Sequence, residues 1–246
     1  MMLTSDVELL DGLPIAFIKS LNSIVASDFH LGYEAALAKS GVFAPKVNLK
    51  KILESLGKAI TKSGADRIII VGDIKHDFSD IESEEFNELY DLMNFLKQEK
   101  ISPVLIKGNH DNFVERYREP FKLAVHGEEA SIGDYLFFHG EEIPKLPKKQ
   151  PRMLIMGQEH PAISITSSVG KREKLRCFLY GEYEKLPILV LPAMGYFSTG
   201  TDVNHEPKDQ LLSPVFRHAD IDGMHAIAIG YGSTIDFGEV SRLRGI

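Results

Sequence analysis

Cysteine, basic charge and long apolar runs are all scarce in this sequence. With a single cysteine, Cys177, among 246 residues, no disulfide can form within the chain, which fits a protein of the reducing cytosol. No apolar stretch approaches the roughly 20 residues of a membrane-spanning helix, and the first residues carry acids where a signal peptide carries basic residues. We therefore expect a cytoplasmic protein with no membrane partner.

The charge balance is acidic, with a formal net charge of -7. Proteins that bind duplex nucleic acid extensively are usually basic, so this class of partner is disfavoured. Metal cations held by carboxylates and imidazoles would soften that argument. Repeats, low-complexity segments and linkers are also lacking, while 43% hydrophobic residues can build a substantial core. We expect a single domain over residues 1–246.

Strands and helices are predicted to alternate in the first half of the chain. Short apolar runs at 23–26, 68–71 and 104–106 are separated by helical periodicities at 48–63 and 82–100. This alternation predicts parallel strands joined by right-handed crossovers. The acids and lysines of the 82–100 helix are expected on its solvated face. In the second half, short strands separated by turns indicate antiparallel β structure.

Five predicted strands end in side chains that can bind a metal ion: Asp28 and His30, Asp73, Asn109 and His110, His139, and Gln158 and His160. The carboxyl ends of strands in such sheets meet at one crevice. Asp28 and His30 are two residues apart and would share one face of a strand, although an Asp that caps the next helix is an equal alternative. Carboxylate, imidazole and amide ligands together suit Mn, Fe or Zn.

The order of these motifs resembles the calcineurin-like metallophosphoesterase superfamily. D-x-H, G-D, G-N-H-D, H-G and G-x-x-H follow one another between about Val25 and Pro161. Residues 26–33 and 72–76 are similar to the exonuclease subunits of double-strand-break repair, whereas Glu159-His160-Pro161 and the compact length look closer to small archaeal and bacterial phosphoesterases. The resemblance implies an α/β (α+β) fold, a four-layer αββα sandwich of two mixed sheets with the metal site at the strand C-terminal edges.

The resemblance also implies two divalent ions, Mn first, with Fe, Zn, Ni or Co as alternatives. Their expected ligands are Asp28, His30 and His160 for one ion, and Asn109 and His139 for the other, with Asp73 bridging both. Relatives usually have His where this chain has Gln158. An amide oxygen is a weaker ligand, so we expect weaker occupancy of the second site, or a water in place of that ligand.

The reaction that the resemblance implies is phosphoester hydrolysis by a hydroxide bridging the two ions. His110 would be the general acid, Asp111 would orient His110, and His76 would position the phosphate. We predict a phosphodiesterase or phosphomonoesterase with a small-molecule substrate. One alternative is a Mn-dependent nuclease acting on DNA or RNA; another, favoured only by Gln158, is a non-catalytic binding protein on this fold. A homodimer is left open.

Overall fold

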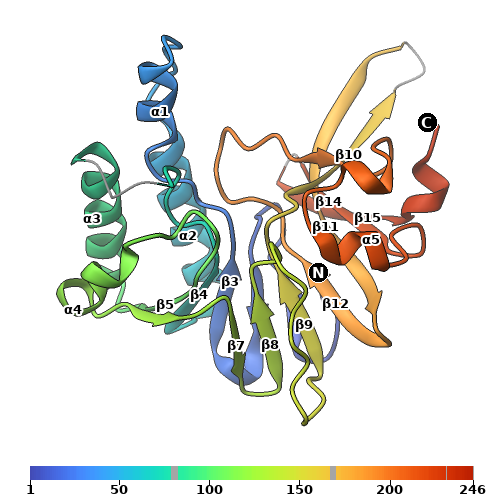
Figure 1. Ribbon diagram of the computed structural model, residues 1–246, viewed down its shortest axis with the longest axis horizontal. Helices are drawn as coiled ribbons and strands as arrows, with labels where there is room; N and C mark the ends of the chain where they lie inside the picture. Colours follow the sequence, from blue (N-terminus) through green and yellow to red (C-terminus); the bar gives the residue numbers. More distant parts are fainter. Residues whose placement is uncertain (79–82, 167–169, 231, 246) are drawn as a thin grey trace.

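Two mixed β-sheets packed face to face form the centre of the molecule (Figure 1). The computed structural model describes residues 1–78, 83–166, 170–230 and 232–245. Within these residues, the first sheet takes its strands from the chain before residue 127 and the second takes its strands after residue 128. The two sheets therefore correspond to consecutive halves of the sequence.

The first sheet has the strand order β1-β2-β3-β4-β5-β6. Its described strands are β1 (Val7–Leu9), β2 (Ala16–Ile18), β3 (Ser23–Ala26), β4 (Arg67–Val71), β5 (Ser102–Ile106) and β6 (Ala124–His126). Strands β3 to β6 pair in parallel, as the alternation of strand and helix predicts, whereas β1 and β2 pair antiparallel.

Two helices, α2 (Asn48–Ser63) and α3 (Ser83–Gln98), cover the outer face of this sheet (Figure 1). The helix α1 (Tyr33–Lys39) projects above the strands, and α4 (Arg118–Phe121) is a single turn near β5. α2 buries Ile52 and Leu56, and α3 buries Leu89 and Leu96, against the outward side chains of β3, β4 and β5. Fully burying such a side chain contributes about 1.5–3 kcal/mol, so this packing fixes the helices on the sheet.

The second sheet has the order β13-β10-β11-β12-β9-β8-β7, with β14 and β15 attached through β11. Its described strands are β7 (Glu129–Ile132), β8 (Tyr135–Phe138), β9 (Met153–Met156), β10 (Pro161–Thr166), β11 (Arg172–Tyr183), β12 (Leu186–Val190), β13 (Thr201–Asp202), β14 (His225–Gly230) and β15 (Ser233–Glu239). The expectation of antiparallel structure here is partly wrong, because β8, β9 and β12 pair in parallel. That parallel pairing brings the ends of β8 and β9 to the same edge.

The outer face of the second sheet is covered by α5 (Pro214–His218) and by the 3-10 turn η4 (Val240–Leu243) (Figure 1). The other described 3-10 turns are η1 (Lys19–Leu21) and η2 (Val114–Tyr117) in the first half of the chain and η3 (Lys208–Gln210) before α5. Between the sheets, Val25 and Ile69 pack with Phe137, Ile155 and Leu189 in one apolar layer. The four-layer prediction is confirmed, and the single domain over 1–246 stays a prediction. Among the described residues, no helix has the length and apolarity to span a bilayer.

Candidate metal centre

The predicted ligands lie in loops that leave the carboxyl ends of five strands. Asp28 and His30 follow β3, Asp73 follows β4, and Asn109 follows β5. From the second sheet, His139 follows β8, and Gln158 and His160 follow β9. Two groups of ligand atoms are close enough to share an ion, one from Asp28, His30 and His160 and the other from Asp28, Asp73 and His139, each within 4.8 Å of one another. The structure thus brings side chains of both sheets together.

These loops have a strained backbone that the sequence does not predict. Five site residues have positive φ angles, namely Asp28 (57°), His30 (48°), Asp73 (53°), Gln158 (63°) and His160 (49°). The argument that Asp28 and His30 share one face of a strand is therefore wrong, because β3 ends at Ala26 and both residues lie beyond it. Such conformations cost on the order of 1 kcal/mol or more each and persist where the surroundings enforce them. Here the N–H of Asp28 donates to the Gly72 carbonyl at 3.1 Å and that of His30 to the Asp73 carbonyl at 3.0 Å.

Carboxylates and imidazoles face one another at the centre of the site. The Nε2 atom of His160 lies 2.9 Å from Oδ1 of Asp28, and Nε2 of His139 lies 3.2 Å from Oδ2 of Asp73. Nε2 of His139 is also 3.8 Å from Oδ1 of Asp28, and Nε2 of His30 is 3.5 Å from Nε2 of His160. Asp28 and His139 are fully buried. The carboxylate common to both groups is that of Asp28, so the bridging role expected for Asp73 stays a prediction.

The donor set fits divalent metal ions. Among the residues that the structure describes, both carboxylate oxygens of Asp28, Oδ1 of Asn109 and Nε2 of His139 are buried and make no hydrogen bond of suitable geometry. Leaving such groups unpaired is costly unless a cation is bound to them. The Nδ1 atom of His139 lies 3.0 Å from the Val71 carbonyl and donates to it, which leaves Nε2 free as a ligand. Mixed imidazole and carboxylate ligands suit Mn, Fe or Zn.

The same groups perturb one another's protonation. Burial alone would raise the pKa of Asp28, but the imidazoles of His160, His139 and His30 hold it below its usual range. For His139, burial lowers the pKa, and the carboxylates of Asp73 and Asp28 outweigh it and raise the pKa to about 10. Burial lowers the pKa of His30 to about 4. The pKa of each of these groups thus depends strongly on the charges of the others, as is common in metal and catalytic sites.

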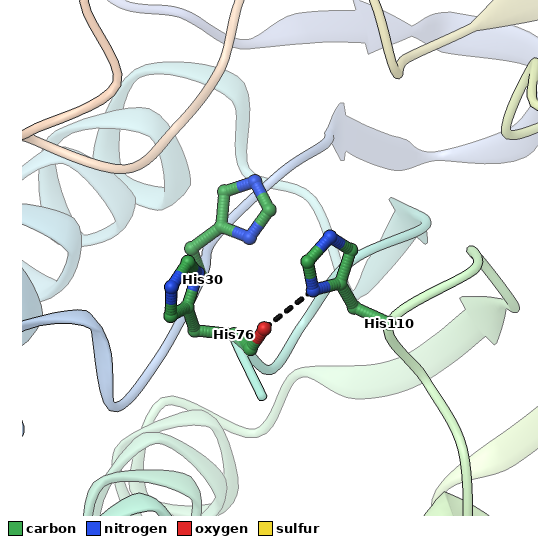
Figure 2. Close-up of side chains that lie close together, drawn as sticks. All are labelled: His30, His76 and His110. Carbon is green, nitrogen blue, oxygen red and sulfur yellow. Dashed lines mark hydrogen bonds between the residues drawn. The ribbon is translucent and has the colours of Figure 1, made fainter. Parts of the chain in front are cut away.

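Three imidazoles lie close together at one side of the site, as Figure 2 shows. The rings of His30, His76 and His110 converge, and Nδ1 of His110 hydrogen-bonds the backbone carbonyl of His76. The other ring nitrogen of His110 is 3.7 Å from Oδ2 of Asp73, and the His110 side chain keeps 15% of its surface exposed. His110 therefore lies between the buried carboxylates and the solvent.

Comparison with known proteins identifies the family. A family model described as calcineurin-like phosphoesterase matches residues 21–225. The chain belongs to the calcineurin-like phosphoesterase family. It is a phosphoric ester hydrolase that depends on divalent metal ions.

Comparison with solved structures finds a protein of the same fold. The Pseudomonas putida nuclease MPE is matched with a TM-score of 0.65 and 17% sequence identity, over 93% of this chain and 94% of that chain. The E. coli phosphoesterase YfcE is matched with a TM-score of 0.38 and 16% identity, over 87% and 96% of the two chains. At these identities, the likeness to MPE shows a shared fold alone. No curated protein matches the chain.

In this phosphoesterase, Asp111 has a different structural role from the one expected. Its carboxylate accepts hydrogen bonds from the backbone N–H groups of Asp73 at 2.8 Å, Ile74 at 2.9 Å and Gly108 at 2.9 Å. The prediction that Asp111 orients the His110 ring is wrong, because that ring hydrogen-bonds the His76 carbonyl instead. Burial and the charge of Asp73 raise the pKa of Asp111 to about 7. Asp111 thus ties the loop after β4 to the loop after β5.

Glu85 is a residue near the site that the sequence prediction missed. Its Oε1 accepts the backbone N–H groups of His76 at 2.9 Å and Asp77 at 3.0 Å, and its Oε2 is 4.0 Å from Nζ of the buried Lys75. The expectation that every acid of this helix lies on its solvated face is therefore wrong. A signal was present, because Glu85 is in helical phase with the buried Leu89 and Leu96. Glu85 holds the turn whose carbonyl contacts His110.

Proposed function

We propose that this chain hydrolyses phosphodiesters through a metal centre built from Asp28, His30, Asp73, His139 and His160, with Asn109 as a further ligand. The observation that carries the proposal is the buried carboxylate of Asp28, which follows a strand of the first sheet. It has the imidazoles of His139 and His160, from the second sheet, within 4 Å, and it accepts no hydrogen bond of suitable geometry from any described residue. Divalent ions held there, Mn first, would lower the pKa of a water and neutralise charge on the phosphate oxygens.

His110 is the proposed general acid. Its Nδ1–H donates to the His76 carbonyl, so a second proton must reside on Nε2, which points toward the Asp73 carboxylate at 3.7 Å. The imidazolium can then give its Nε2 proton to the leaving alkoxide, while His76, 5.7 Å away between ring centroids, helps to orient the phosphate.

Nucleic acid is the second candidate substrate, beside a small-molecule phosphoester. It is supported by the fold shared with a protein described as a nuclease. The net charge of -7 argues against extensive duplex contacts, so a substrate engaged mainly at the metal centre is favoured. A non-catalytic binding role is disfavoured, because the buried ligand atoms of both groups are intact.

The test compares leaving groups. With Mn, Ni, Co or Zn, the wild type should hydrolyse bis-p-nitrophenyl phosphate, and excess chelator should abolish the activity. His110→Ala should lower kcat by about 10²–10⁴-fold on an alkyl phosphodiester, whose leaving group needs a proton, and far less on the nitrophenyl ester.

His126→Ala is the matched control, since His126 is exposed in β6. Equal losses on both esters for His110→Ala would remove the general-acid role. Absence of turnover with every metal would remove the proposed function.

A further inference from the structure

Aromatic rings continue the imidazole cluster in both directions. The contacts run from Phe197 to Tyr33, His76, His110 and Phe78, and we call these five residues the ring chain. Successive ring centroids are 5.7, 4.7, 5.7 and 3.8 Å apart, and the rings of Phe197 and Tyr33 are almost parallel at 15°. The two imidazoles thus link an aromatic ring pair on one side to Phe78 on the other.

The two end members of the ring chain reach solvent to different extents. Phe78 is 55% exposed and Phe197 is partly exposed, with the 50% exposed Tyr196 beside it, its ring 5.2 Å from that of Phe197. The residues come from separate loops, since Tyr33 begins α1, Phe78 follows β4, and Tyr196 and Phe197 follow β12. Exposed aromatic side chains from different loops, gathered beside a polar site, are typical of a ligand-contact surface.

The chemistry of the ring chain limits what the ligand can be. Its centre contains the groups that handle a phosphoester, and flat apolar faces lie on either side. A complementary ligand has a phosphate flanked by planar rings, which describes neighbouring nucleotides of a nucleic acid strand. Stacking of bases on aromatic side chains needs no sequence match but does need free base faces, which a duplex does not offer. The flexible acyl chains of a lipid do not stack on planar rings, so a lipid phosphodiester is a poorer match to this surface.

We propose that the ring chain binds unpaired nucleobases on the two sides of the scissile phosphodiester, with Phe78 at one end and the Tyr33–Phe197 pair at the other. The substrate class is then single-stranded nucleic acid. This inference rests on the proposed hydrolase function and adds to it the residues that select the substrate.

The experiment uses dinucleoside monophosphates, because each has one phosphodiester and therefore one register on the enzyme. Thymidylyl-thymidine is compared with two analogues in which one base or the other is replaced by an abasic sugar. Removal of either base should lower kcat/KM by roughly five- to a hundred-fold, the range that base–aromatic stacking contributes. Phe78→Ala should cause a loss of similar size on the full substrate, and Phe78→Trp should retain activity.

The decisive measurement is the double-mutant cycle between enzyme and substrate. For one of the two abasic analogues, Phe78→Ala should cause no further loss, because the stacking partner is already absent. Phe43→Ala is the matched control, since Phe43 is 90% exposed and lies outside the ring chain. It should behave as the wild type.

Three outcomes would overturn the inference while leaving the hydrolase function standing. They are equal kcat/KM for full and abasic substrates, equal effects of Phe78→Ala and Phe43→Ala, and preferred hydrolysis of a glycerophosphodiester that Phe78→Ala does not affect. A failure to hydrolyse any phosphodiester, bis-p-nitrophenyl phosphate included, would instead refute the proposed function itself.

Discussion

Replacing Gly72 with alanine should damage the metal centre from within the protein core. Gly72 has a φ of +81°, and a Cβ at this position would lie 2.0 Å from Nδ1 of His139. His139 is fully buried and hydrogen-bonded to the Val71 carbonyl, so its ring cannot swing into solvent. The substitution must therefore move a proposed ligand as well as strain the backbone.

The magnitude follows from three costs. An alanine in the left-handed region costs about 1–2 kcal/mol. Overpacking of a filled core costs about 1–3 kcal/mol, and a buried donor that loses its acceptor, here Nδ1 of His139, costs about 1–3 kcal/mol. We expect Gly72→Ala to lose about 3–8 kcal/mol of unfolding free energy in the metal-free protein, and to bind less metal than the wild type.

The matched control is Gly238→Ala. Gly238 also has a φ of +81°, but within the described part of the chain no atom lies within 4 Å of its added Cβ. Gly238→Ala should therefore lose only the unfolding free energy that corresponds to the backbone cost, about 1–2 kcal/mol. Urea unfolding of the metal-free proteins, together with metal analysis by mass spectrometry, measures both effects. If Gly72→Ala were no less stable than Gly238→Ala and bound as much metal, the assignment of His139 to the centre would be wrong.

Two further predictions concern the residues of the metal centre. Gln158→His should raise the Mn content per chain, because imidazole is a stronger ligand than an amide oxygen. Gln98→His is the control, since Gln98 is exposed at the end of α3. Equal, full occupancy in the wild type and Gln158→His would refute the prediction. In the metal-free protein the carboxylates of Asp73 and Asp28 raise the pKa of His139 from 6.5 to about 10 despite its burial. The protonated His139 therefore contributes its full stabilisation below pH 6.5, and this contribution is lost as the pH rises toward 10. The melting temperature of the metal-free protein should fall over that pH range. An equal fall in the melting temperature of a His139→Gln variant would contradict this prediction.

The ends of the strands were predictable because they depend on local sequence. Apolar runs such as Ile68 to Val71 stop abruptly at Gly-Asp, and parallel pairing then brings such ends to one edge. For the groups that support the site, the sequence can indicate burial, as the helical phase of Glu85 does, but it does not indicate their hydrogen-bond partners. Asp111 binds backbone amides of the loop after β4, and Glu85 binds those of His76 and Asp77. Which amide a carboxylate reaches depends on how separate loops cross in space, and no periodicity in the sequence encodes that.

The two sheets use consecutive stretches of the chain, and each supplies only part of the centre. Asp28 and Asp73 come from the half before residue 127, while His139 and His160 come from the half after residue 128. A cleavage between β6 and β7 would thus divide the ligands as well as the polypeptide. Two such fragments could regain the full ligand set only by reassociating. A divalent cation that binds the complete set would therefore favour the association of the two fragments, in addition to its part in the chemistry.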